Sequence, residues 1–250
     1  MAIEQTGSVL EFNAIGTGNS GTVSSTITVP ADAELVIVTV SGAGPDADYF
    51  SGGSMTFTQG GSQVAMVSPT NVGDASAAAW MGAVFYLVSP DTGSNKTLNW
   101  DWLGTSSAGD APVISVTFWK GIDTGDPVRD VDGTQGDLLP FTSPTLTAVS
   151  GDLIFAWAYF FSPAGEGTID SWSNLTLLSQ INSTAGGSDG ALATGSPSGD
   201  TTVEATTGTN VGQGGIIAIV LKEQQAPVVE MVGLVQTQVI LQSSTRIISY

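Results

Sequence analysis

Two long runs of β-forming residues, at 113–119 and 153–161, constrain most strongly what this chain can fold into. The first reads Val-Ile-Ser-Val-Thr-Phe-Trp and the second Leu-Ile-Phe-Ala-Trp-Ala-Tyr-Phe-Phe. Both are rich in the β-branched and aromatic residues that favour strands. We expect them to be neighbouring central strands of a β-sandwich, joined by an acidic loop that contains Asp126 and Asp137.

Further strand patterns recur at short spacing along the chain, with turn signals between them. Residues 23–29, 34–41 and 96–102 alternate apolar and polar side chains, and residues 214–222 form another apolar run. The pair Gly60-Gly61 between two β-forming segments predicts a hairpin over 54–67. No segment predicts a helix longer than about two turns, and no repeat of fixed period is found. The pattern therefore indicates an all-β sandwich or barrel.

The character of the sequence changes at Lys222-Glu223-Gln224-Gln225-Ala226-Pro227, which predicts a domain at 1–222 and a linker with a C-terminal segment at 223–250. The run 234–242 is β-forming and uncharged. One interpretation makes it the last strand of the same sandwich, and the other makes it an arm that adds to the sheet of another chain. We favour the arm, whose assembly residues we expect to be Leu234, Val235, Val239, Ile240, Leu241, Arg246 and Tyr250.

The formal charge of −18, from 23 acidic and 5 basic residues, excludes several classes of partner. Nucleic acid and anionic membrane surfaces are both bound through Lys and Arg, so we expect neither as a partner. The chain has no Cys and no His, which removes disulfides, thiolate metal sites and His-dependent catalysis. We expect no cofactor and no enzymatic activity. The first residues lack the pattern of a signal peptide, which predicts synthesis and folding in a cytoplasm.

Two kinds of binding site have candidate residues. The loop after Ile122 carries Asp123, Asp126, Asp130 and Asp132, and calcium prefers such oxygen ligands, although the spacing is not that of an EF-hand. Four of the six tryptophans lie inside apolar strands and are expected in the core, whereas Trp80 and Trp172 lie near loops and are candidates for glycan contact. Glu166 and Asp170 closely precede Trp172, but two scattered carboxylates do not establish a glycosidase pair.

Four motifs together resemble the β-sandwich modules of tailed-phage virion proteins and bacterial secreted proteins. They are Ile27–Pro30 leading into Leu35–Val40, Val116–Asp123 with Pro127, Ser150–Ala156, and Ile216–Lys222. The resemblance covers about residues 20–222 and excludes the segment after Pro227. It implies a jelly-roll-like antiparallel β-sandwich that serves as a non-enzymatic surface, adhesion or decoration unit, and it carries over no functional residue.

These observations lead to one functional expectation and one alternative. We expect a phage virion structural protein, a capsid decoration or cement protein or a head or tail fibre subunit, that docks through an extended C-terminal β arm. Its expected partners are the major capsid protein or another virion protein and further copies of itself. The alternative is a carbohydrate-binding adhesin module that contacts surface glycans.

Overall fold

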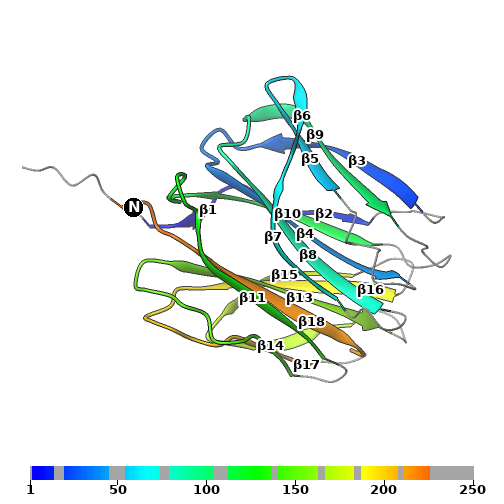
Figure 1. Cartoon of the computed structure of the whole chain (residues 1–250), viewed down its shortest axis with the longest axis vertical. Helices are drawn as coiled ribbons and strands as arrows, with labels where there is room; N and C mark the ends of the chain where they lie inside the picture. The colour runs from blue at the N-terminus through cyan, green and yellow to red at the C-terminus, as the bar shows by residue number, and fades with distance from the viewer. Residues whose placement is uncertain are drawn as a thin grey trace, which may run out of the picture.

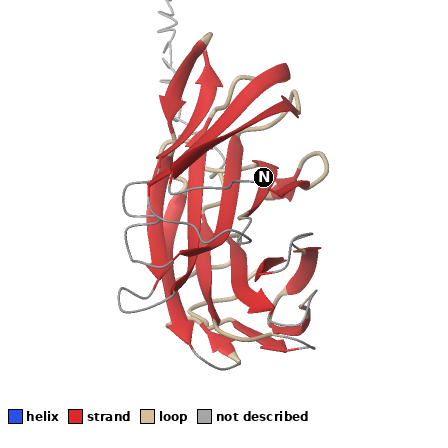
Figure 2. Ribbon diagram, turned by 90° about the vertical axis from the view of Figure 1, so that its right-hand side faces the viewer, coloured by secondary structure: helices blue, strands red, loops and turns tan. Residues whose placement is uncertain are grey.

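The computed structural model describes residues 2–13, 20–44, 54–73, 79–103, 112–136, 140–162, 167–182, 187–207 and 211–225. Within these residues the chain is all-β, with antiparallel pairing throughout and no helix (Figure 2). The prediction of an antiparallel β-sandwich is therefore confirmed. Of the predicted linker and C-terminal arm, residues 223–250, the structure describes 223–225, and residues 226–250 lie outside the described residues.

Four sheets are stacked along the long axis of the molecule (Figure 1). The first half of the chain forms the first outer sheet and the first inner sheet, and the second half forms the second inner sheet and the second outer sheet. The two inner sheets face each other.

The first outer sheet has the order β3-β9-β5-β6 and the first inner sheet has the order β1-β10-β4-β8-β7, in which β2 also pairs with β10. Their strands are β1 (Glu4–Gln5), β2 (Leu10–Asn13), β3 (Ser20–Val29), β4 (Leu35–Gly44), β5 (Ser54–Gln59), β6 (Ser62–Ala65), β7 (Val67–Gly73), β8 (Ala79–Val88), β9 (Gly93–Leu103) and β10 (Val113–Lys120).

The second inner sheet has the order β11-β18-β13-β16-β15 and the second outer sheet has the order β12-β17-β14. Their strands are β11 (Val128–Gly136), β12 (Phe141–Thr142), β13 (Leu153–Ser162), β14 (Ile169–Ser173), β15 (Thr176–Ile181), β16 (Gly187–Gly195), β17 (Glu204–Thr207) and β18 (Gly214–Leu221).

The two halves have the same topology. In the first half, β1 and β2 together take the place of the first strand, and β6 and β7 together take the place of the fifth. When the eight strands of each half are numbered in this way, both inner sheets have the order 1-8-3-6-5 and both outer sheets contain the order 2-7-4. This is the strand order of a jelly roll, so the chain is a tandem pair of jelly rolls. The register agrees as well, because Trp119 pairs with Leu35 in one half and Leu221 with Leu153 in the other.

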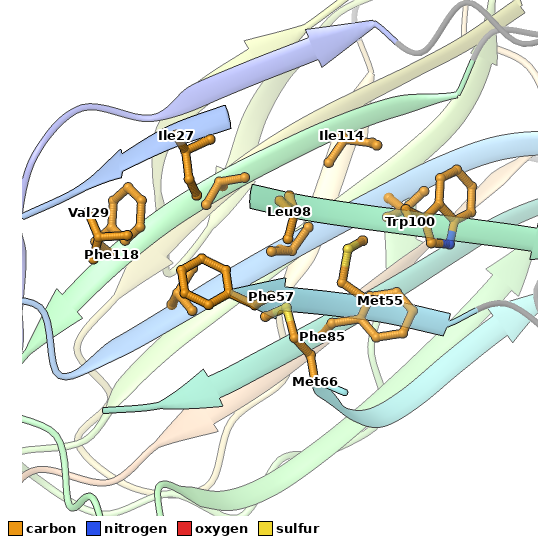
Figure 3. Packing of buried hydrophobic residues seen from close by; sticks show 14 of the residues in the cluster. Ile27, Val29, Met55, Phe57, Met66, Phe85, Leu98, Trp100, Ile114 and Phe118 are labelled. Atoms are coloured by element: carbon orange, nitrogen blue, oxygen red, sulfur yellow. The ribbon is translucent and has the colours of Figure 1, made fainter. Parts of the chain in front are cut away.

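Three hydrophobic cores separate the four sheets. Figure 3 shows the first outer core, where Phe57 and Trp100 from the outer sheet pack against Phe85 and Phe118 from the inner sheet. The central core lies between the two inner sheets and contains Trp157. The second outer core lies between the second inner sheet and the second outer sheet. The two halves therefore share the central core and pack directly against each other.

The continuous apolar runs of the sequence are the strands of the inner sheets. β10, β13 and β18 are buried along almost their whole length, because each contacts one core on each face. The expectation that the runs 113–119 and 153–161 are neighbouring strands was wrong. β10 pairs with β1, β2 and β4, whereas β13 pairs with β16 and β18 in the facing sheet. The rings of Trp119 and Phe155 meet across the central core with centroids 6.0 Å apart.

Candidate functional site

The predicted acidic loop is a turn only as far as Pro127, where the chain crosses from one jelly roll to the other, and Asp130 and Asp132 lie in strand β11. Residues 121–127, which we call the crossover turn, connect β10 to β11. The chain passes the same place again at its described C-terminal end. There the Lys222 amide donates to the Pro127 carbonyl at 2.9 Å, and the Gln224 amide donates to the Gly121 carbonyl at 2.8 Å. Residues 226–250 therefore continue from a fixed point beside the crossover turn.

The four aspartates proposed as calcium ligands bind backbone amides or a lysine. Asp123 Oδ1 accepts from the Gly125 amide at 3.0 Å, as an ordinary Asx turn does. Asp132 Oδ1 accepts from the amide of the next residue at 2.7 Å. Asp126 pairs with the Lys222 ammonium group.

Asp130 joins two segments of the second half. Its Oδ1 accepts from the Val131 amide at 2.9 Å, and its Oδ2 accepts from the Thr147 amide at 2.6 Å. Within the described part of the chain, no three acidic, His or Cys side chains gather into a group that could hold a metal ion. Asp123 therefore shapes the crossover turn, Asp126 pairs with Lys222, and Asp130 and Asp132 accept from backbone amides within and beside β11.

Two other carboxylates, which the sequence analysis did not single out, hold the same end of the molecule together. Glu34 Oε2 accepts from the amides of Gly121 and Ile122 at 2.6 and 3.1 Å, which fastens the crossover turn to the start of β4. Asp152 immediately precedes β13, as Glu34 precedes β4. It is buried and forms two hydrogen bonds with the Arg129 guanidinium, the shorter at 2.5 Å. The bond with Asp152 raises the pKa of Arg129 above its ordinary value.

The four basic residues of the described chain are all in ion pairs. Arg129 and Lys222 have just been described, and Lys96 contacts Asp91 at 3.4 Å. Lys120 contacts Asp32 at 3.1 Å and Glu4 at 3.4 Å. Hydrogen bonds from Thr6 and from Lys120 lower the pKa of Asp32, and the pairing raises the pKa of Lys120. In the described part of the chain, no Lys or Arg side chain is therefore left unpaired to attract an anionic partner.

The tryptophans fall into two groups. Trp100, Trp119 and Trp157 are buried, as predicted, whereas the side chain of Trp102 lies outside the described residues. Trp172, a candidate for glycan contact, is partly buried and packs against the second outer core. Its indole nitrogen is buried and makes no hydrogen bond to a described residue. The side chain of the other candidate, Trp80, lies outside the described residues, so glycan contact stays a prediction.

The predicted assembly residues also lie outside the described part of the chain. Leu234, Val235, Val239, Ile240, Leu241, Arg246 and Tyr250 all belong to residues 226–250. What the structure adds is the position from which they depart, beside the crossover turn. Among the described residues, no helix has both the length and the apolar character needed to cross a membrane.

Comparison with models of known protein families and with curated proteins gives no match.

Proposed function

We propose that this protein is a structural subunit of a phage virion, a capsid decoration or cement protein or a head or tail fibre subunit, which docks through residues 226–250. The observation that carries the proposal is the pair of jelly rolls that share one apolar core. Jelly rolls are a common architecture of viral capsid proteins. Because both inner sheets are covered on both faces, the pair is a rigid body that does not need a partner to bury its core.

The C-terminal segment supports a docking role. After Gln225 the chain has 25 more residues, of which 234–242 carry no charge. Val235, Val239 and Leu241 lie on one side of such a strand, and the other side carries Gln236, Gln238 and Gln242 together with Leu234 and Ile240, so one side is more apolar than the other. A strand of this kind binds a partner by adding to the edge of its sheet.

The charge distribution supports an outward-facing body. The described cations are all paired, so the surplus carboxylates give the body a negative surface that resists non-specific association. The largely apolar arm, in which residues 234–242 carry no charge, then supplies the specific contact that the body does not.

The proposal is tested on particles. Phage particles from the source culture are banded on a density gradient and probed by mass spectrometry and by immunogold labelling with antibodies against residues 1–225. We expect the protein at regular positions on the particles. Its presence in the soluble fraction alone would overturn the proposal.

The arm is tested separately by adding purified protein to particles that lack it. Full-length protein should sediment with the particles, and the 1–225 truncation should remain in solution. Val239→Asp should weaken attachment about tenfold or more, because it buries a charge in the contact. Gln238→Asp is the matched control, since it adds the same charge on the less apolar side. Attachment of the truncated protein would show that the arm does not dock.

A further inference from the structure

The outer edge of β3 is a sheet edge with few of the usual protections: its one register shift lies close to its C-terminal end, between Ile27 and Val29. β3 is ten residues long and lies at the end of the first outer sheet, where among the described strands it pairs with β9 alone. Its register with β9 is regular from Ser20 to Ile27. It contains neither a charged residue nor a proline. Natural proteins protect edge strands with charges, prolines, bulges or short length, because an open edge is a template for another strand.

The other described edge strands carry such protections. β6 and β12 are short, with four and two residues. β7 contains Pro69 and a register shift, and β11 contains a register shift and several charges. β15 has a register shift, and its Gln180 side chain accepts from the Ile169 amide of the neighbouring chain segment. β1, β2 and β14 are each five residues or fewer, and each contains an acidic residue.

The duplicated topology gives β3 a counterpart within the same molecule. This is β12, the second strand of the second jelly roll, which has Pro140 before it and Pro144 after it. Proline cannot donate to a β-ladder and is confined to protected positions in sheets. The same strand of the same topology is thus blocked in one half and open in the other, so the jelly-roll fold does not by itself require an open edge.

The side chains along β3 suit pairing with a second copy. Ile27 and Val29 are buried in the first outer core, so the strand is already held in place. Ser24, Thr26 and Thr28 point to solvent and are exposed. Two molecules of net charge −18 repel each other, and edges that carry carboxylates would bring like charges together. Two antiparallel β3 strands instead place Ser and Thr opposite Ser and Thr, whose hydroxyl groups form favourable cross-strand pairs.

We propose that two copies of this chain associate through their β3 edges, in antiparallel pairing about a two-fold axis, to join their first outer sheets into one continuous sheet. A two-fold contact uses the same patch on both subunits, which a self-complementary edge provides. This inference deepens the proposed structural role, on which it rests, by naming the contact between copies.

The test replaces exposed Ser and Thr residues of β3 by charged residues and measures the molecular mass in solution by sedimentation equilibrium. The full-length protein should sediment as a dimer of 25.4 kDa subunits. Ser24→Glu/Thr26→Glu/Thr28→Glu should raise the dissociation constant about a hundredfold, because like charges then face each other across the pair. Ser24→Lys/Thr26→Lys/Thr28→Lys should do the same alone, and a mixture of the two variants should recover the dimer.

Two controls separate the alternatives. Ser62→Glu/Gln63→Glu/Ala65→Glu adds the same three charges to exposed positions of β6, the opposite edge of the same sheet, and should leave the dimer intact. Unfolding midpoints close to that of the unmodified protein would show that the β3 variants fold, as expected for solvent-exposed positions. A monomeric full-length protein, or a dimer that dissociates through the β6 variant, would overturn the proposal.

The 1–225 truncation distinguishes this proposal from the docking of the arm. It should remain dimeric through β3 even though it no longer attaches to particles. If truncation alone abolishes the dimer, the β3 edge receives the C-terminal segment of another copy and the pairing of two β3 strands is wrong. If the dimer survives but neither form attaches to particles, the virion role fails while the β3 contact stands.

Discussion

The two jelly rolls share one strand order but fill their outer cores in different ways. In the first half, the outer sheet supplies bulky side chains such as Phe57 and Trp100, which pack against the valines of β4. In the second half, the outer sheet supplies Phe141, Ile169 and the partly buried Trp172, and the facing inner strands supply small residues such as Ala156, Ala158 and Ala218 beside Phe160. Close packing constrains the summed volume between two sheets and leaves open which residues supply it.

The central core belongs to both halves, and its aromatic residues depend on glycines. Trp157 and Tyr159 of β13 are fully buried. A Cβ atom on Gly190 would lie 1.8 Å from the Trp157 ring, and one on Gly82, in the facing sheet, would lie 2.1 Å from the Tyr159 ring. Interlocking of this kind fixes how the two jelly rolls stack.

Among the variants that test this comparison of the two halves, we expect the largest loss of stability from removing the Trp157 side chain. The Trp157→Ala variant should lower the free energy of unfolding by about 3–5 kcal/mol, because it leaves a large cavity in the shared core. It also removes the hydrogen bond of 3.3 Å from the indole nitrogen to the Val40 carbonyl, which links the two halves. Denaturant unfolding measures the loss, and hydrogen exchange should show reduced protection in both halves.

Trp100→Ala is the matched control, since Trp100 is equally buried but lies in the first outer core. Its cost should be similar, with the loss of protection concentrated in the first half. Equal loss of protection across all four sheets in both variants would show that the halves unfold as one unit, and would remove the basis for treating them separately.

A smaller effect is expected from overfilling the same core. Gly82→Ala should destabilise the protein by about 1–3 kcal/mol, because the Tyr159 ring is held by its own neighbours and cannot move away freely. Gly199→Ala is the control, as a Cβ there meets nothing within 4 Å. Thermal unfolding of the two variants measures the difference, and a neutral Gly82→Ala would mean that the inner sheets slide to make room.

The smallest expected effect is on how much the protein loses stability in acid, through Asp91 in the first half. The Gly60 amide, which donates to Asp91 Oδ2 at 2.6 Å, and the Lys96 ammonium group lower the pKa of Asp91 below 3.8. A carboxyl group whose pKa is lower in the folded state stabilises the protein above its unfolded pKa, and the contribution is lost as the pH falls through the folded pKa.

Asp91→Asn should therefore make the fall of the melting temperature between about pH 5 and pH 2 slightly shallower. Lys96→Met should reduce the slope less, because the hydrogen bond from Gly60 is the main cause of the lowered pKa. A steeper fall of the melting temperature with pH in Asp91→Asn than in the unmodified protein would contradict the direction of this pKa shift.

Several elements could be predicted from local sequence because their causes are local. The hairpin at Gly60-Gly61 forms as expected, with positive φ angles of 57° and 79° that glycine adopts without strain. Three of the four tryptophans expected in the core are buried. The acidic loop was predicted correctly only as far as Pro127, because its continuation through Asp130 and Asp132 is strand β11. Its position between two jelly rolls was not predicted, because nothing within the segment shows which sheets its flanking strands join.

The duplication escaped detection because the halves share a pattern and few residues. Leu35-Val36-Ile37-Val38 and Leu153-Ile154-Phe155-Ala156 occupy the same place in the two jelly rolls, and only the first leucine is identical. A jelly roll needs apolar residues at the right spacing and accepts many side chains at each position. Equivalence of this kind is visible in strand order and register, and a search for repeated residues does not find it.

The sequence by itself determined most of the strands and the burial of several of them. Continuous apolar runs such as β18 became inner strands and the alternating run of β3 became an outer strand, because burial on one face or two leaves a trace in the residue pattern. The exceptions are β11, predicted as a loop, and β4, whose alternating run is buried on both faces. The tertiary structure alone decided which strands pair, that the sheets form two jelly rolls, and which edge stays open. Backbone hydrogen bonds between strands are nearly the same for every sequence, so partners are selected by the long-range packing of whole sheets.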